Sequence, residues 1–294
     1  MLRQVVTALL SADLRWVMVA LALYLAAIVA GGLRWQAIVR MLGGDIRTRH
    51  AVLATIATVF VNNVTPSGRL AGEACRIAIT RLKGSITLPL GAVASLGDRL
   101  SDLPGLAVLG LVSLPVLQPI MGGHARTLLA AGALSAVVIA VIGPRVRSAL
   151  RSWLLTRRRE FGGTPVSARR VALVVGLGMA IWVEDLFRLM AVAAALDVRL
   201  GLPQASALCV MMVVGGLVPT LGGLGAVEGG LVGVMLAFGI DLQTAIAITA
   251  VERAISYAFS TLAGGLAVAW LGGRELLRSY DRAGPADTGP GGGS

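Results

Sequence analysis

Long apolar runs separated by short, arginine-containing connections dominate this chain, a pattern typical of membrane-spanning helices. The runs predicted to span in full are Leu14–Gly31, Ile86–Leu117, Thr127–Ile142, Val171–Leu196 and Leu242–Leu271. We expect a transmembrane domain over residues 14–273. The amphipathic segment 1–13 is too short to span and is predicted to lie at the interface. The Gly/Pro-rich tail, 274–294, is predicted to be cytoplasmic and disordered.

Two further apolar stretches are interrupted by proline and glycine. The first is Ala51–Val64 followed by Arg69–Leu82, and the second is Ala205–Pro219 followed by Gly225–Phe238. Glycine and proline end helices and leave backbone N–H and C=O groups unpaired. Within a bilayer such groups are tolerated only where protein or a polar cavity surrounds them. Each stretch is therefore predicted to be a re-entrant helix hairpin.

The two broken stretches share an order of residues. Each has a proline, then glycines, then a glutamate, Glu73 or Glu228. Asp98-Arg99 follows Glu73 by 25 and 26 positions, and Glu252-Arg253 follows Glu228 by 24 and 25. The alternative is coincidence in a glycine-rich membrane protein. We predict an all-α polytopic membrane protein, a helical bundle with two inverted repeats over about 51–117 and 205–271.

Composition agrees with this class. Of the 294 residues, 56% are hydrophobic and 14% charged, whereas a soluble domain carries about 25% charge. The net charge is +11, and Lys83 is the only lysine. Because the arginines lie mostly between apolar runs, the positive-inside effect explains them better than nucleic-acid binding. The few cysteines and histidines (Cys75, Cys209, His50 and His124) have no metal or disulfide spacing.

Arginine placement predicts the orientation. The segment Leu33–His50, the loop Pro144–Arg170 and the tail are expected to be cytoplasmic, and the loops near Met121 and Asp197 external. The N-terminus then lies outside, and the hairpins enter from opposite faces. The Pro144–Arg170 loop can also attract anionic lipid headgroups.

Charged residues inside the apolar runs are candidates for a binding site, because each lone charge there costs a few kcal/mol. The alternative is a set of ion pairs that only hold helices together. The predicted substrate-binding residues are Asn63, Arg69, Glu73, Arg76, Asp98, Arg99, Glu184, Asp185, Arg188, Gly223, Gly225, Glu228, Glu252 and Arg253.

These residue types suit a lipid headgroup in a cavity open sideways to the bilayer. Arginine binds phosphate in a bidentate manner, and helix N-termini after the breaks supply N–H donors. The glutamates balance the arginines or hold a cationic amine. Gly222-Gly-Leu-Gly225 lacks the lysine of a nucleotide-binding loop. A phospholipid or polyprenyl phosphate is the natural ligand, and no catalytic residue, metal or cofactor is expected.

The motifs Asn63…Pro66-Ser-Gly68…Gly72-Glu73…Arg76, Asp98-Arg99…Asp102, Pro219…Gly222-Gly-Leu-Gly225…Glu228 and Glu252-Arg253 together resemble a known family. It is the flippase-like membrane family, best known from the transmembrane domain of lysylphosphatidylglycerol synthetases. The resemblance covers roughly residues 14–271. It implies re-entrant helices and movement of aminoacylated or other anionic lipids between leaflets.

Two departures from the family pattern qualify that expectation. No soluble aminoacyl-transferase domain follows residue 271, so this chain is not expected to attach lysine to lipid itself. Family members usually begin with one more spanning helix than this sequence shows.

The function predicted from sequence is therefore a non-enzymatic lipid translocase in a bacterial-type inner membrane. Its expected partners are membrane lipids, with a homo-oligomer or a separate lipid-modifying enzyme left open. One alternative is a membrane enzyme, or enzyme subunit, acting on a lipid-linked headgroup, for which Glu73 and Asp98 are the only candidate acid/base pair. The other is an ion-coupled transporter of small anions.

Overall fold

The computed structural model describes residues 10–66, 70–121 and 167–270, and every regular element in these ranges is helical. In chain order they are α2 (Leu14–Met41), α3 (Thr48–Val64), α4 (Leu70–Lys83), α5 (Leu88–Met121), α7 (Ala168–Ala194), α8 (Leu202–Gly216), η1 (Leu221–Gly223), α9 (Ala226–Ala237), α10 (Leu242–Arg253) and the π-helical η2 (Ala254–Phe259). Helix continues after η2 to Trp270.

Two helices are long and apolar enough to cross a membrane, Leu14–Met41 and Leu88–Gln118. Large apolar side chains also cover the outside of the bundle, as Leu111, Leu262 and Leu266 show with exposed fractions of 65%, 71% and 73%. Such an apolar exterior suits contact with lipid tails.

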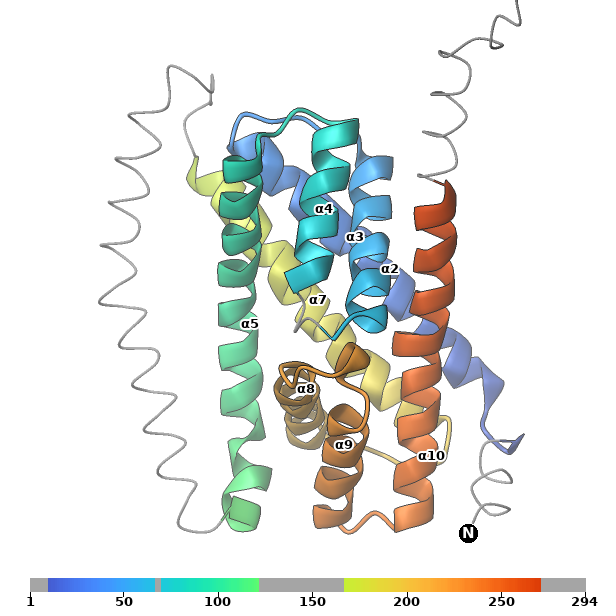
Figure 1. The fold of residues 1–294 in the computed structure, drawn as a ribbon. Coiled ribbons are helices and arrows are strands. Elements are labelled where there is room, and N and C mark those ends of the chain that lie inside the picture. The colour runs from blue at the N-terminus through green and yellow to red at the C-terminus, as the bar shows by residue number, and fades with distance from the viewer. Residues whose placement is uncertain (1–9, 67–69, 122–166, 271–294) are drawn as a thin grey trace, which may run out of the picture.

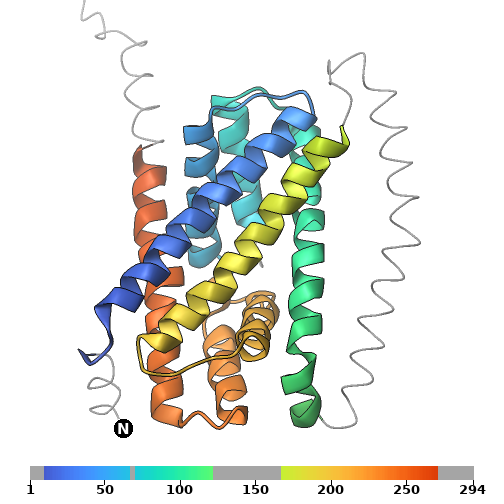
Figure 2. The ribbon, with the colours of Figure 1, turned by 180° about the vertical axis from the view of Figure 1, so that it is seen from behind.

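Short helices meet inside a frame of long ones (Figure 1). The α3–α4 pair occupies one half of the bundle, and α8, η1 and α9 occupy the other, so the end of α3 contacts η1 near the middle. α5 and α10 flank the two pairs. α2 and α7 lie side by side and antiparallel across one face, which Figure 2 shows from the front.

Local sequence explains several helix ends. Asp13 begins α2 by accepting a hydrogen bond from the Arg15 N–H at 2.8 Å. Asp241 begins α10 by accepting from the N–H groups of Gln243 and Thr244, both at 3.0 Å. An acidic N-cap satisfies donors that the first turn otherwise leaves unpaired.

The break between α8 and α9 depends on its glycines. Gly222, Gly223 and Gly225 all have positive φ angles, of 57°, 77° and 85°. L-residues with a side chain adopt this region only at a cost. A Cβ on Gly222 would also lie 2.5 Å from Cε2 of Tyr257. In the α3–α4 pair, Gly72 permits close packing alone, because a Cβ there would overlap Asn62.

The all-helical class predicted from sequence is confirmed in the described residues, and most predicted helix ends lie within a few residues of those in the structure. One prediction is wrong. Leu33–His50 is not a connecting segment, because α2 continues to Met41 and only residues 42–47 connect it to α3. Arg34 and Trp35 are buried in the bundle, which explains why the helix continues through them.

A second difference lies in the final helix. The predicted span Leu242–Leu271 is interrupted by the π-helix η2 directly after Arg253, which the sequence pattern does not reveal. Several predictions lie outside the described residues: most of the interfacial segment, Arg69, the span Thr127–Ile142, nearly all of the Pro144–Arg170 loop and the tail.

Candidate functional site: a charged cavity at the middle of the bundle

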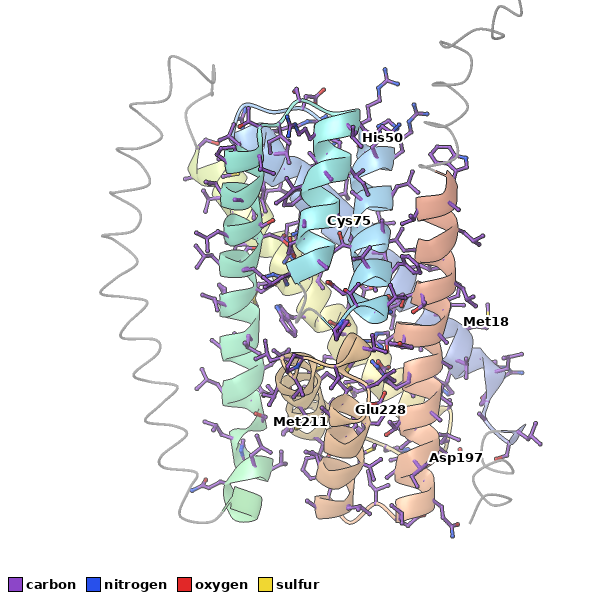
Figure 3. The ribbon with its side chains drawn as sticks, viewed as in Figure 1. Met18, His50, Cys75, Asp197, Met211 and Glu228 are labelled. Atoms are coloured by element: carbon purple, nitrogen blue, oxygen red, sulfur yellow. The ribbon has the colours of Figure 1, made fainter. Side chains whose placement is uncertain are left out.

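A cavity of about 360 Å³ lies where the two short-helix pairs face one another. Its volume is in the range of small-molecule sites. Nine charged side chains contribute to its lining, and both halves of the chain supply them: Arg34, Glu73, Arg76, Asp98, Arg99, Asp102, Asp185, Arg188 and Arg253. Figure 3 places Glu228 between His50 and Asp197 along the bundle, nearer to Asp197.

The first charged cluster surrounds Arg76 on α4. Its Nη2 lies 2.6 Å from Glu73 Oε2 and 2.8 Å from Asp98 Oδ2. Its guanidinium carbon stacks 4.0 Å from the centroid of the Trp35 ring, and the Trp35 indole N–H donates to Thr80 Oγ1 at 2.9 Å. Two carboxylates and an aromatic face therefore hold this buried cation in place.

Arg34 of α2 extends this cluster, although its sequence context predicts a cytoplasmic connecting segment. Its Nε lies 2.8 Å from Asp98 Oδ1, and its Nη1 lies 2.5 Å from Asp102 Oδ1. The Nε makes no hydrogen bond, but at this distance the guanidinium still neutralises the Asp98 charge. Asp98 thus lies between two arginines, Arg34 and Arg76.

The second cluster surrounds Arg188 of α7. Its Nη1 lies 2.5 Å from Glu252 Oε2 and also contacts Oε1, and its Nη2 lies 2.8 Å from Asp185 Oδ1. Glu252 is fully buried. The ring of Tyr24 lies 5.6 Å from the guanidinium carbon of Arg188. As in the first cluster, two carboxylates and an aromatic ring from α2 hold the arginine.

Two further ion pairs close the tips of the short-helix pairs. Arg99 of α5 pairs with Glu73 near the start of α4, and Arg253 Nε lies 2.6 Å from Glu228 Oε1 near the start of α9. Arg253 Nη2 also donates to the Gly222 carbonyl at 3.0 Å, and Glu228 Oε2 accepts from the Gly225 N–H at 2.6 Å. The Arg99 side chain is 42% exposed, far more than those of Arg76 and Arg188.

Asn63, near the end of α3, ties the first short-helix pair to the final long helix. Its Nδ2 donates to Ser260 Oγ at 3.0 Å and to Thr261 Oγ1 at 2.9 Å, just after the π-helix. In return, the Tyr257 hydroxyl donates to the Asn63 carbonyl at 3.1 Å. The Tyr257 ring lies 4.8 Å from the Arg253 guanidinium carbon. π-helical turns are frequent at functional sites, and this one lies beside both breaks.

The remaining predicted site residues are placed differently. Gly223 lines the cavity. Glu252 and Glu228 do not line it, but they pair with Arg188 and Arg253, which do. Gly225 begins α9 and does not line the cavity. Glu184 does not line it either. Arg69 lies outside the described residues.

Chemically, the cavity combines fixed and accessible guanidinium groups. The deeply buried arginines shape it, while Arg99 and Arg253 face it with one carboxylate partner each among the described residues. Guanidinium groups bind carboxylates and phosphates with the same geometry. A phosphate can therefore replace a carboxylate on either arginine.

Comparisons with known proteins point to one membrane family. Residues 1–264 match the family model described as the lysylphosphatidylglycerol synthase TM region. A UPF0104 membrane protein of Pyrococcus horikoshii is 22% identical over 92% of this chain and 91% of its own length. One from Methanothermobacter thermautotrophicus is 25% identical over 94% of this chain and 91% of its own length. The family model spans most of the chain, and the chain therefore belongs to the family of the lysylphosphatidylglycerol synthase transmembrane region.

Proposed function

We propose that the chain is a lipid translocase of the cytoplasmic membrane, which moves an anionic or aminoacylated phospholipid, or a polyprenyl phosphate, between leaflets. One observation carries the proposal: a cavity rich in arginine lies in the middle of an apolar bundle, where the short helices of both halves are interrupted. A headgroup crossing a bilayer needs such a polar site halfway, while its apolar chains need lipid. The apolar exterior of the bundle lets the acyl chains stay in contact with lipid.

The proposal includes the two predicted inverted repeats, about 51–117 and 205–271, each with a re-entrant pair of short helices and each now extended by the long helix before it, α2 or α7. Corresponding ion pairs support it. In each half, an arginine of the first long helix, Arg34 or Arg188, pairs with an acid of the last one, Asp98 or Glu252. The arginine that follows this acid in sequence then pairs with a glutamate of the second short helix. Inverted repeats of this kind place the substrate between them in many transporters.

Transport then works by exchange of ion-pair partners. When a lipid phosphate approaches Arg99, it takes the place of the Glu73 carboxylate, and the cation keeps a partner throughout. The Arg253–Glu228 pair plays the same part for the opposite leaflet, because the two short-helix pairs come from opposite ends of the bundle. Opening one pair at a time exposes the cavity alternately to each side.

The contacts of Glu73 and Asp98 favour transport over the enzymatic alternative. Both carboxylates accept from Arg76 Nη2, and Glu73 also accepts from Arg99. A general base needs a carboxylate directed at a substrate proton rather than held by guanidinium groups.

Mass spectrometry of the lipids that co-purify with the protein tests the proposal. The variants are Arg99→Ala, in the cavity, and Arg81→Ala, an exposed arginine near the end of α4. We expect the wild type and Arg81→Ala to retain one anionic or aminoacylated lipid above its membrane abundance, and Arg99→Ala to retain distinctly less of it. Bulk membrane composition in all three would refute a headgroup site, and saturable uptake of a water-soluble anion would favour the anion-transport alternative.

A further inference from the structure

A second recess lies outside the central cavity, between the C-terminal part of α2 and the first turns of α7. It is a groove of about 650 Å³, lined mainly by these two helices, which lie in front in Figure 2. Its walls combine two arginines with apolar side chains, chiefly Leu33, Ala37, Arg40, Arg170, Leu173 and Leu177.

The groove is polar at one end and apolar at the other. Because α2 and α7 are antiparallel here, Arg40 and Arg170 lie together at the end of the bundle. Leu33 precedes Arg40 by seven residues, and Leu177 follows Arg170 by seven, so both leucines lie about 10 Å further into the bundle. This is the profile of a phospholipid that stands in one leaflet, with its phosphate at the interface and its chain in the hydrocarbon.

The surrounding charge favours an anion. Arg47, Arg49, Arg81, Lys83 and Arg169 lie at the same end, where Asp45 is the only carboxylate among the described residues. Arg40 Nε lies 3.3 Å from Asp45 Oδ1, and both side chains are more than half exposed, so this pair is weak. The Gln36 amide already donates to the Ile46 carbonyl at 2.6 Å and accepts from Thr48 Oγ1. Recognition of a headgroup therefore depends on the arginines.

We propose that this groove is a second lipid site, which holds one anionic phospholipid with its phosphate on Arg40 and Arg170 and an acyl chain along Leu33, Leu173 and Leu177. The site shares no lining residue with the central cavity. It is a resident-lipid site of a single leaflet, and its occupancy does not depend on translocation.

The test is lipid binding to the full chain in nanodiscs of phosphatidylcholine containing a small fraction of phosphatidylglycerol, with bound lipid counted by native mass spectrometry. The variant Arg40→Gln/Arg170→Gln is compared with Arg47→Gln/Arg81→Gln, in which two exposed arginines at the same end are changed. We expect retention of phosphatidylglycerol to fall about 25-fold in the groove variant, about fivefold for each arginine, and to stay near wild type in the control. An equal loss in both pairs would overturn the site in favour of a diffuse charge effect.

Two further variants test the apolar part of the groove and its independence from the central cavity. Ala37→Phe fills the apolar part and should remove the bound lipid while both arginines remain. Arg99→Ala, in the central cavity, should leave groove binding unchanged. Retention of phosphatidylglycerol at the wild-type level in Ala37→Phe, or equal retention of phosphatidylcholine and phosphatidylglycerol by the wild type, would contradict the proposal.

Discussion

Arg253, the last residue of α10, holds Glu228 of α9 at 2.6 Å and so ties the second broken helix pair to a long helix. Arg99 of α5 holds Glu73 of α4 in the corresponding way. Each pair joins residues 25 or 26 positions apart, so the shared spacing in the sequence corresponds to a shared contact. The acid directly before each of these arginines pairs with an arginine of the first long helix in its half. Asp98 pairs with Arg34 of α2, and Glu252 pairs with Arg188 of α7.

These tip pairs should be needed for transport more than for folding. Glu228→Gln and Arg99→Ala are each expected to abolish lipid translocation, because the exchange of partners requires both charges. Both side chains are partly exposed, so folding should remain largely intact. Translocation in proteoliposomes, measured beside thermal unfolding in detergent, checks this. Loss of folding in both variants would favour a purely structural role.

The Arg188–Glu252 pair should instead be needed for stability. Glu252→Gln leaves a buried guanidinium with only the Asp185 carboxylate, and we expect a loss of about 3–5 kcal/mol in the free energy of unfolding. Reversible unfolding in mixed detergent measures it. The double variant Glu252→Gln/Arg188→Met removes both charges and should recover much of the loss. A double variant no more stable than Glu252→Gln would contradict the ion-pair explanation.

The stability change on replacing a glycine in or beside the second break by alanine should depend on the local backbone conformation and space. Gly229, exposed on α9 with open space beside it, should accept alanine with a gain of up to about 1 kcal/mol. Gly225→Ala should cost about 1–2 kcal/mol, because φ is 85° although space is open. Gly222→Ala should cost more, since its Cβ also meets Tyr257. Thermal unfolding of the three variants gives the order, and equal effects would show that backbone conformation does not decide it.

The orientation predicted from arginine placement is testable with single cysteines. In a background without Cys75 and Cys209, Arg199→Cys and Arg81→Cys place exposed thiols at opposite ends of the bundle. The positive-inside effect predicts that a membrane-impermeant maleimide labels the first on intact cells and the second only after permeabilisation. The reverse pattern would invert the topology.

Sequence reasoning located the interrupted helices because glycine and proline act locally. The positive φ angles of Gly222 and Gly225 follow from residue type and spacing. The i, i+3 neighbours Glu73–Arg76 and Asp185–Arg188 are also paired in the structure.

Partners across the bundle were not predictable in this way. Asp98-Arg99 and Glu252-Arg253 are adjacent in sequence, yet each member pairs with another helix, because neighbouring residues of a helix point about 100° apart. The sequence predicts a connecting-segment position for Arg34, because an arginine after an apolar run resembles a topological signal. Only the packing of α2 against α5 reveals its acidic partners Asp98 and Asp102.

The central claim is that lipid headgroups cross through the charged cavity. Proteoliposomes containing a fluorescent anionic lipid, quenched from outside with dithionite, measure this crossing directly. The wild type and the exposed-site control Arg81→Ala should move the lipid faster than protein-free vesicles, and Arg99→Ala/Arg253→Ala should match the protein-free rate. A wild type no faster than protein-free vesicles, or a double variant as fast as the wild type, would contradict the account.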